Sequence, residues 1–154
     1  MSTSIREEIV AALVAALTAG GGGSPVGLTV HRERTRPIEV DSLPAIMLYF
    51  DDDVPKPLGQ QTYRAPLTER QLSLALEARA AGSASVSPDE ALDPVLNWAL
   101  QAIRADETFG GLANGVEEGR TVWASKEGDT LVAAAKLSIT IKYRTSRLDP
   151  TSKS

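Results

Sequence analysis

The apolar and polar residues of this chain follow two periods, which separate expected helices from expected strands. In residues 4–18 apolar side chains recur at every fourth position, the period of one helix face. The members of this stripe are Ile5, Ile9, Leu13 and Leu17. Ser4 and Glu7 fit a capping box in front of the stripe, and Gly20 is a typical helix stop. We therefore predict a first helix between Ser4 and Gly20.

A second helix is predicted over residues 87–103. Ser87-Pro-Asp-Glu90 is another capping box, with proline at the first helical position, where its fixed backbone angle fits. The apolar face comprises Leu92, Val95, Leu96, Ala99, Leu100 and Ile103. Pro94 is expected to bend or restart the helix because it has no amide hydrogen to donate.

Four other segments have strand patterns. Residues 28–35 alternate, residues 116–125 form a further candidate, and residues 45–50 are a continuous apolar run, typical of a strand covered on both faces. The composition of residues 68–81 favours a helix, but their leucines and alanines alternate with polar residues. We give the period more weight than the propensity and predict a strand there.

The last predicted strand has the most regular alternation. One face carries Leu131, Ala133, Ala135, Leu137, Ile139, Ile141 and Tyr143. The other face carries Lys136, Ser138, Thr140, Lys142 and Arg144, and only Val132 and Ala134 break its polarity. A strand of about 14 residues exceeds the usual length of roughly 5–6. We expect it to project beyond its own sheet and to contact a neighbouring chain, for example by strand addition.

Together these elements predict the α+β class. We expect one domain over residues 1–145, with a mostly antiparallel or mixed sheet and two main helices packed on one face. Residues 51–66 contain three aspartates, three prolines and a glycine, so we expect a long loop there. The polar tail over residues 146–154 is expected to be disordered.

Composition narrows the classes of function. The chain has no cysteine, which excludes disulfides, thiolate catalysis and cysteine metal sites. A formal net charge of −4 and 5% aromatic residues argue against sequence-specific nucleic-acid binding. The apolar stretch over residues 9–17 is too short to span a membrane, and the acidic residues before it make a poor signal peptide.

Candidate chemistry is sparse. His31 is the only histidine, no nucleophile elbow accompanies it, and we interpret it as a polar strand residue. Asp51, Asp52 and Asp53 form a solvated loop, a subunit contact or a divalent-cation site, but consecutive carboxylates do not easily converge on one ion. We therefore expect no catalytic site, no cofactor and no metal.

Charged and aromatic residues are the better candidates for an interface. Arg32, Arg34 and Arg36 share one strand face if the strand continues that far. They then either protect an edge strand, contact phosphate or pair with carboxylates of a neighbouring subunit. Trp98 is expected in the core or as an anchor on its helix, and Trp123 is either a core residue or an interface anchor. The interface candidates are Arg32, Arg34, Arg36, Asp51, Asp52, Asp53, Trp123, Lys142 and Arg144.

The order of motifs resembles the tail terminator proteins of long-tailed phages, including the lambda-like minor tail protein U group. The resemblance is carried by Leu92-Asp-Pro-Val-Leu-Asn-Trp98, then Phe109-Gly-Gly-Leu-Ala113, a strand, a turn, and a strand that ends in Tyr143-Arg-Thr145. The N-terminal half agrees in the order of its elements, so the resemblance covers most of residues 4–145.

This resemblance implies a structural virion protein, assembled in the host cytoplasm, and no enzyme. Such a protein forms a ring, usually of six subunits, at the head-proximal end of the tail. The ring stops polymerisation of the tail tube protein and presents a surface to the neck or head-completion proteins, while DNA passes through its lumen. Another neck protein that joins head to tail is the alternative, and a small ligand-binding α+β domain is a more distant one.

Overall fold

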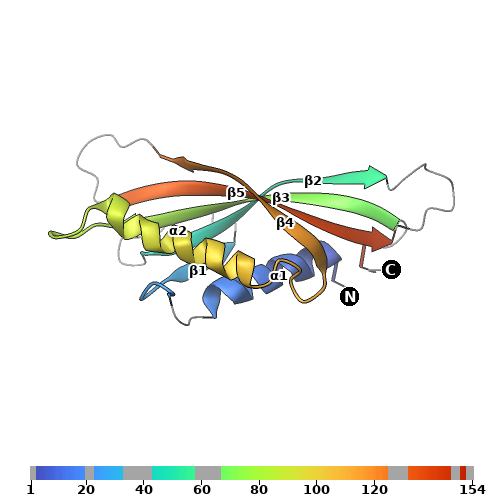
Figure 1. The fold of residues 1–154 in the computed structure, drawn as a ribbon, viewed down its shortest axis with the longest axis horizontal. Helices are drawn as coiled ribbons and strands as arrows, with labels where there is room; N and C mark the ends of the chain where they lie inside the picture. The colour runs from blue at the N-terminus through green and yellow to red at the C-terminus, as the bar shows by residue number, and fades with distance from the viewer. Residues whose placement is uncertain are drawn as a thin grey trace.

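The computed structural model describes residues 3–19, 23–32, 43–57, 67–124, 132–146 and 150–151. It confirms the α+β class: a mixed five-stranded sheet packs against two helices. The elements are α1 (Ile5–Thr18), β1 (Thr29–Arg32), β2 (Ala45–Pro57), β3 (Leu67–Ala81), α2 (Pro88–Ala105), β4 (Ala113–Trp123) and β5 (Val132–Ser146). Figure 1 shows both helices on the same face of a strongly twisted sheet.

The strand order is β1-β2-β3-β5-β4, with β1 parallel to β2 and the other neighbours antiparallel. The last strand, β5, lies between β3 and β4, and every residue from Val132 to Ser146 pairs with β3. The expectation that it projects beyond its own sheet is therefore wrong. The reason is that β3 is equally long, with 15 residues in each strand.

The predicted loop over residues 51–66 is also wrong in its first half. β2 continues through the aspartates to Pro57, in register with β3 as far as Thr68. A bulge between Phe50 and Asp52 absorbs the irregularity. Pro55 and Pro57 are tolerated in β2 because they lie along an edge with no described strand partner. On this side of β2, β1 pairs only with Ala45 to Leu48. Residues 58–66 lie outside the described part.

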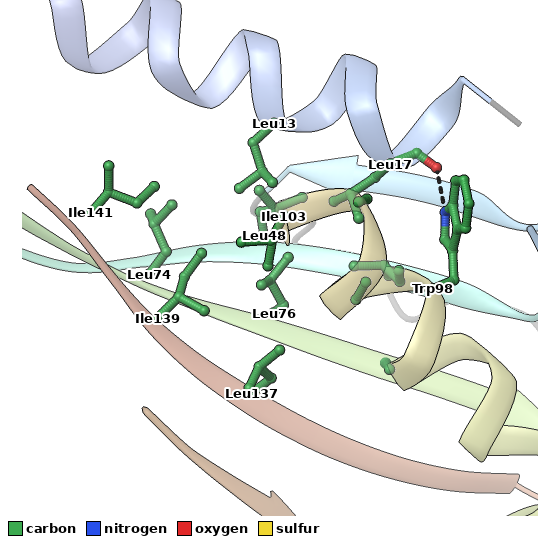
Figure 2. Close-up of a cluster of buried hydrophobic side chains, with 14 of the residues drawn as sticks. Leu13, Leu17, Leu48, Leu74, Leu76, Trp98, Ile103, Leu137, Ile139 and Ile141 are labelled. Carbon is green, nitrogen blue, oxygen red and sulfur yellow. Dashed lines mark hydrogen bonds between the residues drawn. The ribbon is translucent and has the colours of Figure 1, made fainter. Parts of the chain in front are cut away.

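Both predicted helix starts are confirmed. The Ser4 hydroxyl accepts a hydrogen bond from the Glu7 amide at 3.1 Å, and the Ser87 hydroxyl accepts one from the Glu90 amide at 3.3 Å. Pro94 lies inside α2 without ending it. Trp98 joins the two helices, because its indole nitrogen donates to the carbonyl oxygen of Leu17 at 2.9 Å (Figure 2).

The core lies between the helices and the sheet (Figure 2). The predicted α1 stripe is buried, and so are the alternating residues of β3 and β5. The side chains at the centre include Leu13, Leu17, Leu48, Leu74, Leu76, Ile103, Leu137, Ile139 and Ile141. The strand predicted over residues 68–81 is thus confirmed. Its residues favour a helix by intrinsic propensity, but β3 is stabilised as a strand because it pairs with β2 on one side and β5 on the other.

The two ends of the described chain meet beside α1. The amide of Ile5 donates to the carbonyl oxygen of Pro150 at 3.0 Å, so at this point the tail returns to the start of the first helix, which differs from the expected disorder. Residues 147–149 and 152–154 lie outside the described part. Within the described residues, no helix is long and apolar enough to cross a membrane.

Candidate interaction surfaces

The three consecutive aspartates of β2 have different surroundings. Asp51 and Asp52 are exposed, whereas the Asp53 side chain is only 10% exposed. The bulge at Phe50 and Asp52 puts Asp53 in register with the buried Leu72, on the helix side of the sheet. No group of three or more potential metal-ligand residues converges within the described ranges. The strand geometry thus separates the carboxylates.

Asp53 is the centre of a polar cluster that also contains Arg6, Arg70, Tyr143 and Thr145. The Asp53 Oδ2 atom accepts hydrogen bonds from the Tyr143 hydroxyl at 2.5 Å and from Arg6 Nη1 at 3.2 Å. Arg70 Nη1 lies 4.0 Å from Asp53 Oδ1, and Arg70 Nε donates to the hydroxyl of Thr145 at 3.3 Å. Two arginines therefore surround one nearly buried carboxylate.

Tyr143 links this polar cluster to the apolar core. Its side chain is buried and belongs to the core cluster. Burial raises the pKa of Tyr143 above its ordinary value, and the hydrogen bond to Asp53 raises it further. The phenol is therefore held in its protonated form, as the donor that the carboxylate needs. A cavity of about 110 Å³ adjoins the group, with Ser4 and Pro150 completing its wall.

The first of the three candidate arginines pairs within its own chain. The Arg32 guanidinium contacts both carboxylate oxygens of Glu7 in α1, one of them at 2.9 Å, and lies 5.8 Å from the centre of the Phe50 ring. The hydrogen bond from Arg32 lowers the pKa of Glu7. Arg32 thus ties β1 to α1 and covers part of Phe50. Arg34 and Arg36 lie outside the described residues.

The two basic candidates of β5 lie on the face away from the helices. Lys142 Nζ is 2.7 Å from Glu117 Oε1 of β4, and this contact raises the pKa of Lys142 and lowers that of Glu117. Arg144 is exposed, opposite Glu69 in the register of β3 and β5. Lys142 therefore joins two strands of one sheet.

Trp123 is 57% exposed, which excludes the core interpretation. Its role as an interface anchor stays a prediction. Its neighbour Val122 is 52% exposed. At the opposite edge of the sheet, Phe50 and Val54 of β2 are also exposed. Sequence reasoning missed Phe50 because the apolar run over residues 45–50 predicts cover on both faces, and β1 ends too early to supply it.

The face away from the helices has its own small hollow of about 410 Å³. Its wall includes Glu77, Val122, Ala134 and Lys136. Glu77 is also paired with Arg79 of the same strand at 2.7 Å.

In comparisons with known proteins, no protein-family model matches this sequence, and no curated protein sequence matches it.

Proposed function

We propose that this chain is a structural virion protein that acts as a tail terminator. In this proposal, six copies form a ring on the head-proximal end of the tail tube. The ring stops addition of tube protein and offers its other side to a neck or head-completion protein. The mixed sheet with two helices on one face is compatible with the fold that the resemblance implies.

The observation that carries the proposal is a pair of different apolar edges on one subunit. Phe50 and Val54 are exposed on β2, and Val122 and Trp123 are exposed on β4, which lies at the other side of the sheet. Surfaces of different shape on opposite sides of a subunit make head-to-tail contacts, and such contacts close into rings when the rotation between copies fits. One self-complementary patch would favour a two-fold dimer instead.

The charge of the chain fits a lumen that DNA crosses. The net charge is −4 per chain, so a ring of six copies is strongly acidic. Acidic surfaces repel the phosphate backbone instead of retaining it. DNA would therefore pass through such a ring without sequence-specific binding.

Two measurements test this function together. Multi-angle light scattering of the purified chain, alone and with tube protein, is expected to give a particle of six 16.3 kDa copies. Electron microscopy of tubes assembled with a small molar fraction of the chain is expected to show shorter tubes that carry a cap at one end. A monomer in both scattering experiments, with unchanged tube lengths, would refute the proposal.

Virions that lack the protein separate the two assembly roles. Overlong tails support a terminator, because nothing then stops the tube. Tails of normal length that are detached from heads would instead identify a neck protein that joins head to tail.

A further inference from the structure

We infer that neighbouring copies in the ring meet edge to edge, with the end of β4 in one copy seated against a groove beside β2 in the next. This inference deepens the proposed function, since it assigns the subunit contact to named residues. The term "Trp123 corner" is used for Arg120, Val122 and Trp123, and "Phe50 groove" for the hollow lined by Arg6, Glu7, Phe50, Asp52, Asp53 and Leu72.

The Phe50 groove lies beside the part of β2 that the described β1 strand does not pair with. β1 pairs with Ala45 to Leu48 only, so the outer edge of β2 has no described strand partner from Tyr49 onward. Between this edge and the start of α1 lies a hollow of about 350 Å³. Its apolar lining is Leu72, which is buried, and Phe50, which is 36% exposed. The groove therefore combines an apolar surface with a charged rim.

The Trp123 corner is the corresponding projection. β4 pairs only with β5, so its outer side is open along the described strand. Trp123 is in register with the buried Ala135 and thus lies on the helix side of the sheet, while Val122 is in register with the exposed Lys136 on the other face. More than half of each apolar side chain is exposed to solvent, at the last two residues of the strand.

The two edges match face by face. On β2, Phe50 is in register with the buried Leu74 on the helix side, and Val54 is in register with Gln71 on the other face. Each edge thus carries one aromatic residue on the helix side and one valine on the open side. Two copies with their helices on the same side therefore bring aromatic against aromatic. The two valines then share the other face, about two residues apart along the strands, because Val54 aligns with Gln71 of β3 and Val122 aligns through Lys136 with Glu77.

Unpaired charges favour the same partner. Asp51 and Asp52 are exposed beside Phe50, and Arg120 is exposed within the Trp123 corner, all three without a charged partner in the described part of the chain. The two acidic residues of β4 are already neutralised within the chain: Glu117 pairs with Lys142 and Glu118 with Arg104. A basic edge therefore faces an acidic one when a second copy docks.

Side chains, and not a continuous backbone ladder, form this contact. β2 has a bulge at Phe50 and Asp52 and prolines at 55 and 57, and β4 has a bulge between Glu118 and Thr121. Such features oppose strand addition at an edge. The last strand, β5, does not supply such an edge from Ala135 to Tyr143, because these residues lie between β3 and β4.

The match also sets the inclination of the subunits. Trp123 aligns through Ala135 with Ala78 of β3, whereas Phe50 aligns with Leu74 of the same strand. The two anchors are thus offset by four residues, or about 13 Å at roughly 3.3 Å per residue. A constant offset between neighbours tilts the strands relative to the ring axis, as the stagger does in a closed barrel.

Cross-linking offers a direct test because the chain has no cysteine. We expect the double variant Val54→Cys/Val122→Cys, treated with a short bismaleimide, to give a ladder of covalent oligomers that ends at the ring size. Each single variant should stay uncross-linked, since its cysteine faces no other cysteine. Dimers from a single variant, or no ladder from the double variant, would overturn the inference.

Charged substitutions test the same contact in solution. Trp123→Asp and Phe50→Asp should each weaken assembly by roughly 30-fold or more, as loss of a central aromatic anchor does, with an unchanged circular dichroism spectrum. Val26→Asp and Val86→Asp are the controls, because these valines are 96% and 38% exposed and lie outside both edges. The controls should form rings of normal size.

The most specific test is to mix the two edge variants, Trp123→Asp and Phe50→Asp. Each retains one intact half of the contact, so the mixture should form a heterodimer that neither variant forms alone. Rings of normal size from either edge variant, or a mixture that stays monomeric, would overturn the contact.

Trp123→Asp rings that still shorten tubes refute the contact but not the function. Wild-type rings that leave tubes unchanged refute the function but not the contact.

Discussion

The middle of the sheet and its Asp53 end are built by the same strands but held together differently. Under the helices, β3 and β5 supply only aliphatic side chains, such as Leu76 and Ile139, which are 1% and 2% exposed (Figure 2). Toward the other end, Tyr143 of β5 and Arg70 of β3 surround Asp53 of β2. One continuous ladder of strands therefore passes from an apolar core to a polar cluster.

The difference follows from the lengths of the elements. α1 begins at Ile5, and in Figure 1 the ends of β2, β3 and β5 extend beyond this start. Polar side chains occupy helix-side positions there although Thr145 is only 1% exposed, and they are tolerated because they contact one another. Tyr143 fits the boundary because its ring packs with the core while its hydroxyl reaches Asp53. The middle is held by packing, whereas the end is held by two hydrogen bonds to Asp53 Oδ2 and by the nearby charge of Arg70. The buried Oδ1 atom of Asp53 accepts no hydrogen bond within the described residues.

The largest effect is expected from a cavity in the middle of the sheet. Leu76→Ala should lower the free energy of unfolding by roughly 2–5 kcal/mol, because it removes buried methyl groups from a packed core. Ser73→Ala, on the same strand but in register with exposed Asp52, is the control and should cost far less. Chemical denaturation measures both. A loss below about 1 kcal/mol for Leu76→Ala would show that the middle is not tightly packed.

A smaller effect is expected at the polar end. Tyr143→Phe should lower the free energy of unfolding by about 1–3 kcal/mol, because Asp53 loses a donor while it stays nearly buried. Tyr49→Phe is the matched control, since the Tyr49 hydroxyl donates only to the sulfur of Met47, at 3.4 Å. If both variants cost the same, the Asp53 cluster is not a stabilising feature. The single variant Asp53→Asn and the double variant Asp53→Asn/Tyr143→Phe complete the double-mutant cycle.

Alkaline pH should reveal the same hydrogen bond without removing an atom. The pKa of Tyr143 is raised by folding, so above pH 10 the unfolded chain releases this proton while the folded chain keeps it. The contribution of Tyr143 to the free energy of unfolding is therefore complete below about pH 10. Above this pH it decreases by up to about 1.4 kcal/mol per pH unit. The stability gap between wild type and Tyr143→Phe should therefore narrow above pH 10. A gap that is constant from pH 8 to 11 would contradict this.

The smallest effect is expected at the rim of the cluster. Arg6 is 3.2 Å from Asp53, but its side chain is 48% exposed, so water screens the pair. Arg6→Ala should therefore cost at most about 1 kcal/mol, with the exposed Arg144→Ala as control. A loss as large as that of Tyr143→Phe, measured by the same denaturation experiment, would show that the arginine and not the tyrosine holds the carboxylate.

Local features were predictable wherever neighbours in the chain decide them. The caps at Ser4 and Ser87 depend on residues three positions away, and both form as the sequence predicts. The alternation over residues 68–81 predicted the strand and its buried face, although helix propensity pointed the other way. These patterns survive folding because a period records which face of an element meets the core.

The candidate surfaces were predictable only in part. Trp123 was singled out, but sequence could not choose between core and interface, since that depends on whether α2 or a loop covers the end of β4. Asp53 looked like its two neighbours, and only the bulge and the position of Tyr143 set it apart. Phe50 was missed because the length of β1, a different segment, decides its exposure.

The sequence by itself determined the class of the fold, the two capped helices and the buried faces of the long strands, because short-range spacing encodes them. Only the tertiary structure decided the strand order, the central place of β5 and the contact between Asp53 and Tyr143, which are 90 residues apart. It also decided which apolar residues stay exposed at the sheet edges. These outcomes depend on where one element ends relative to another, and no local period records that.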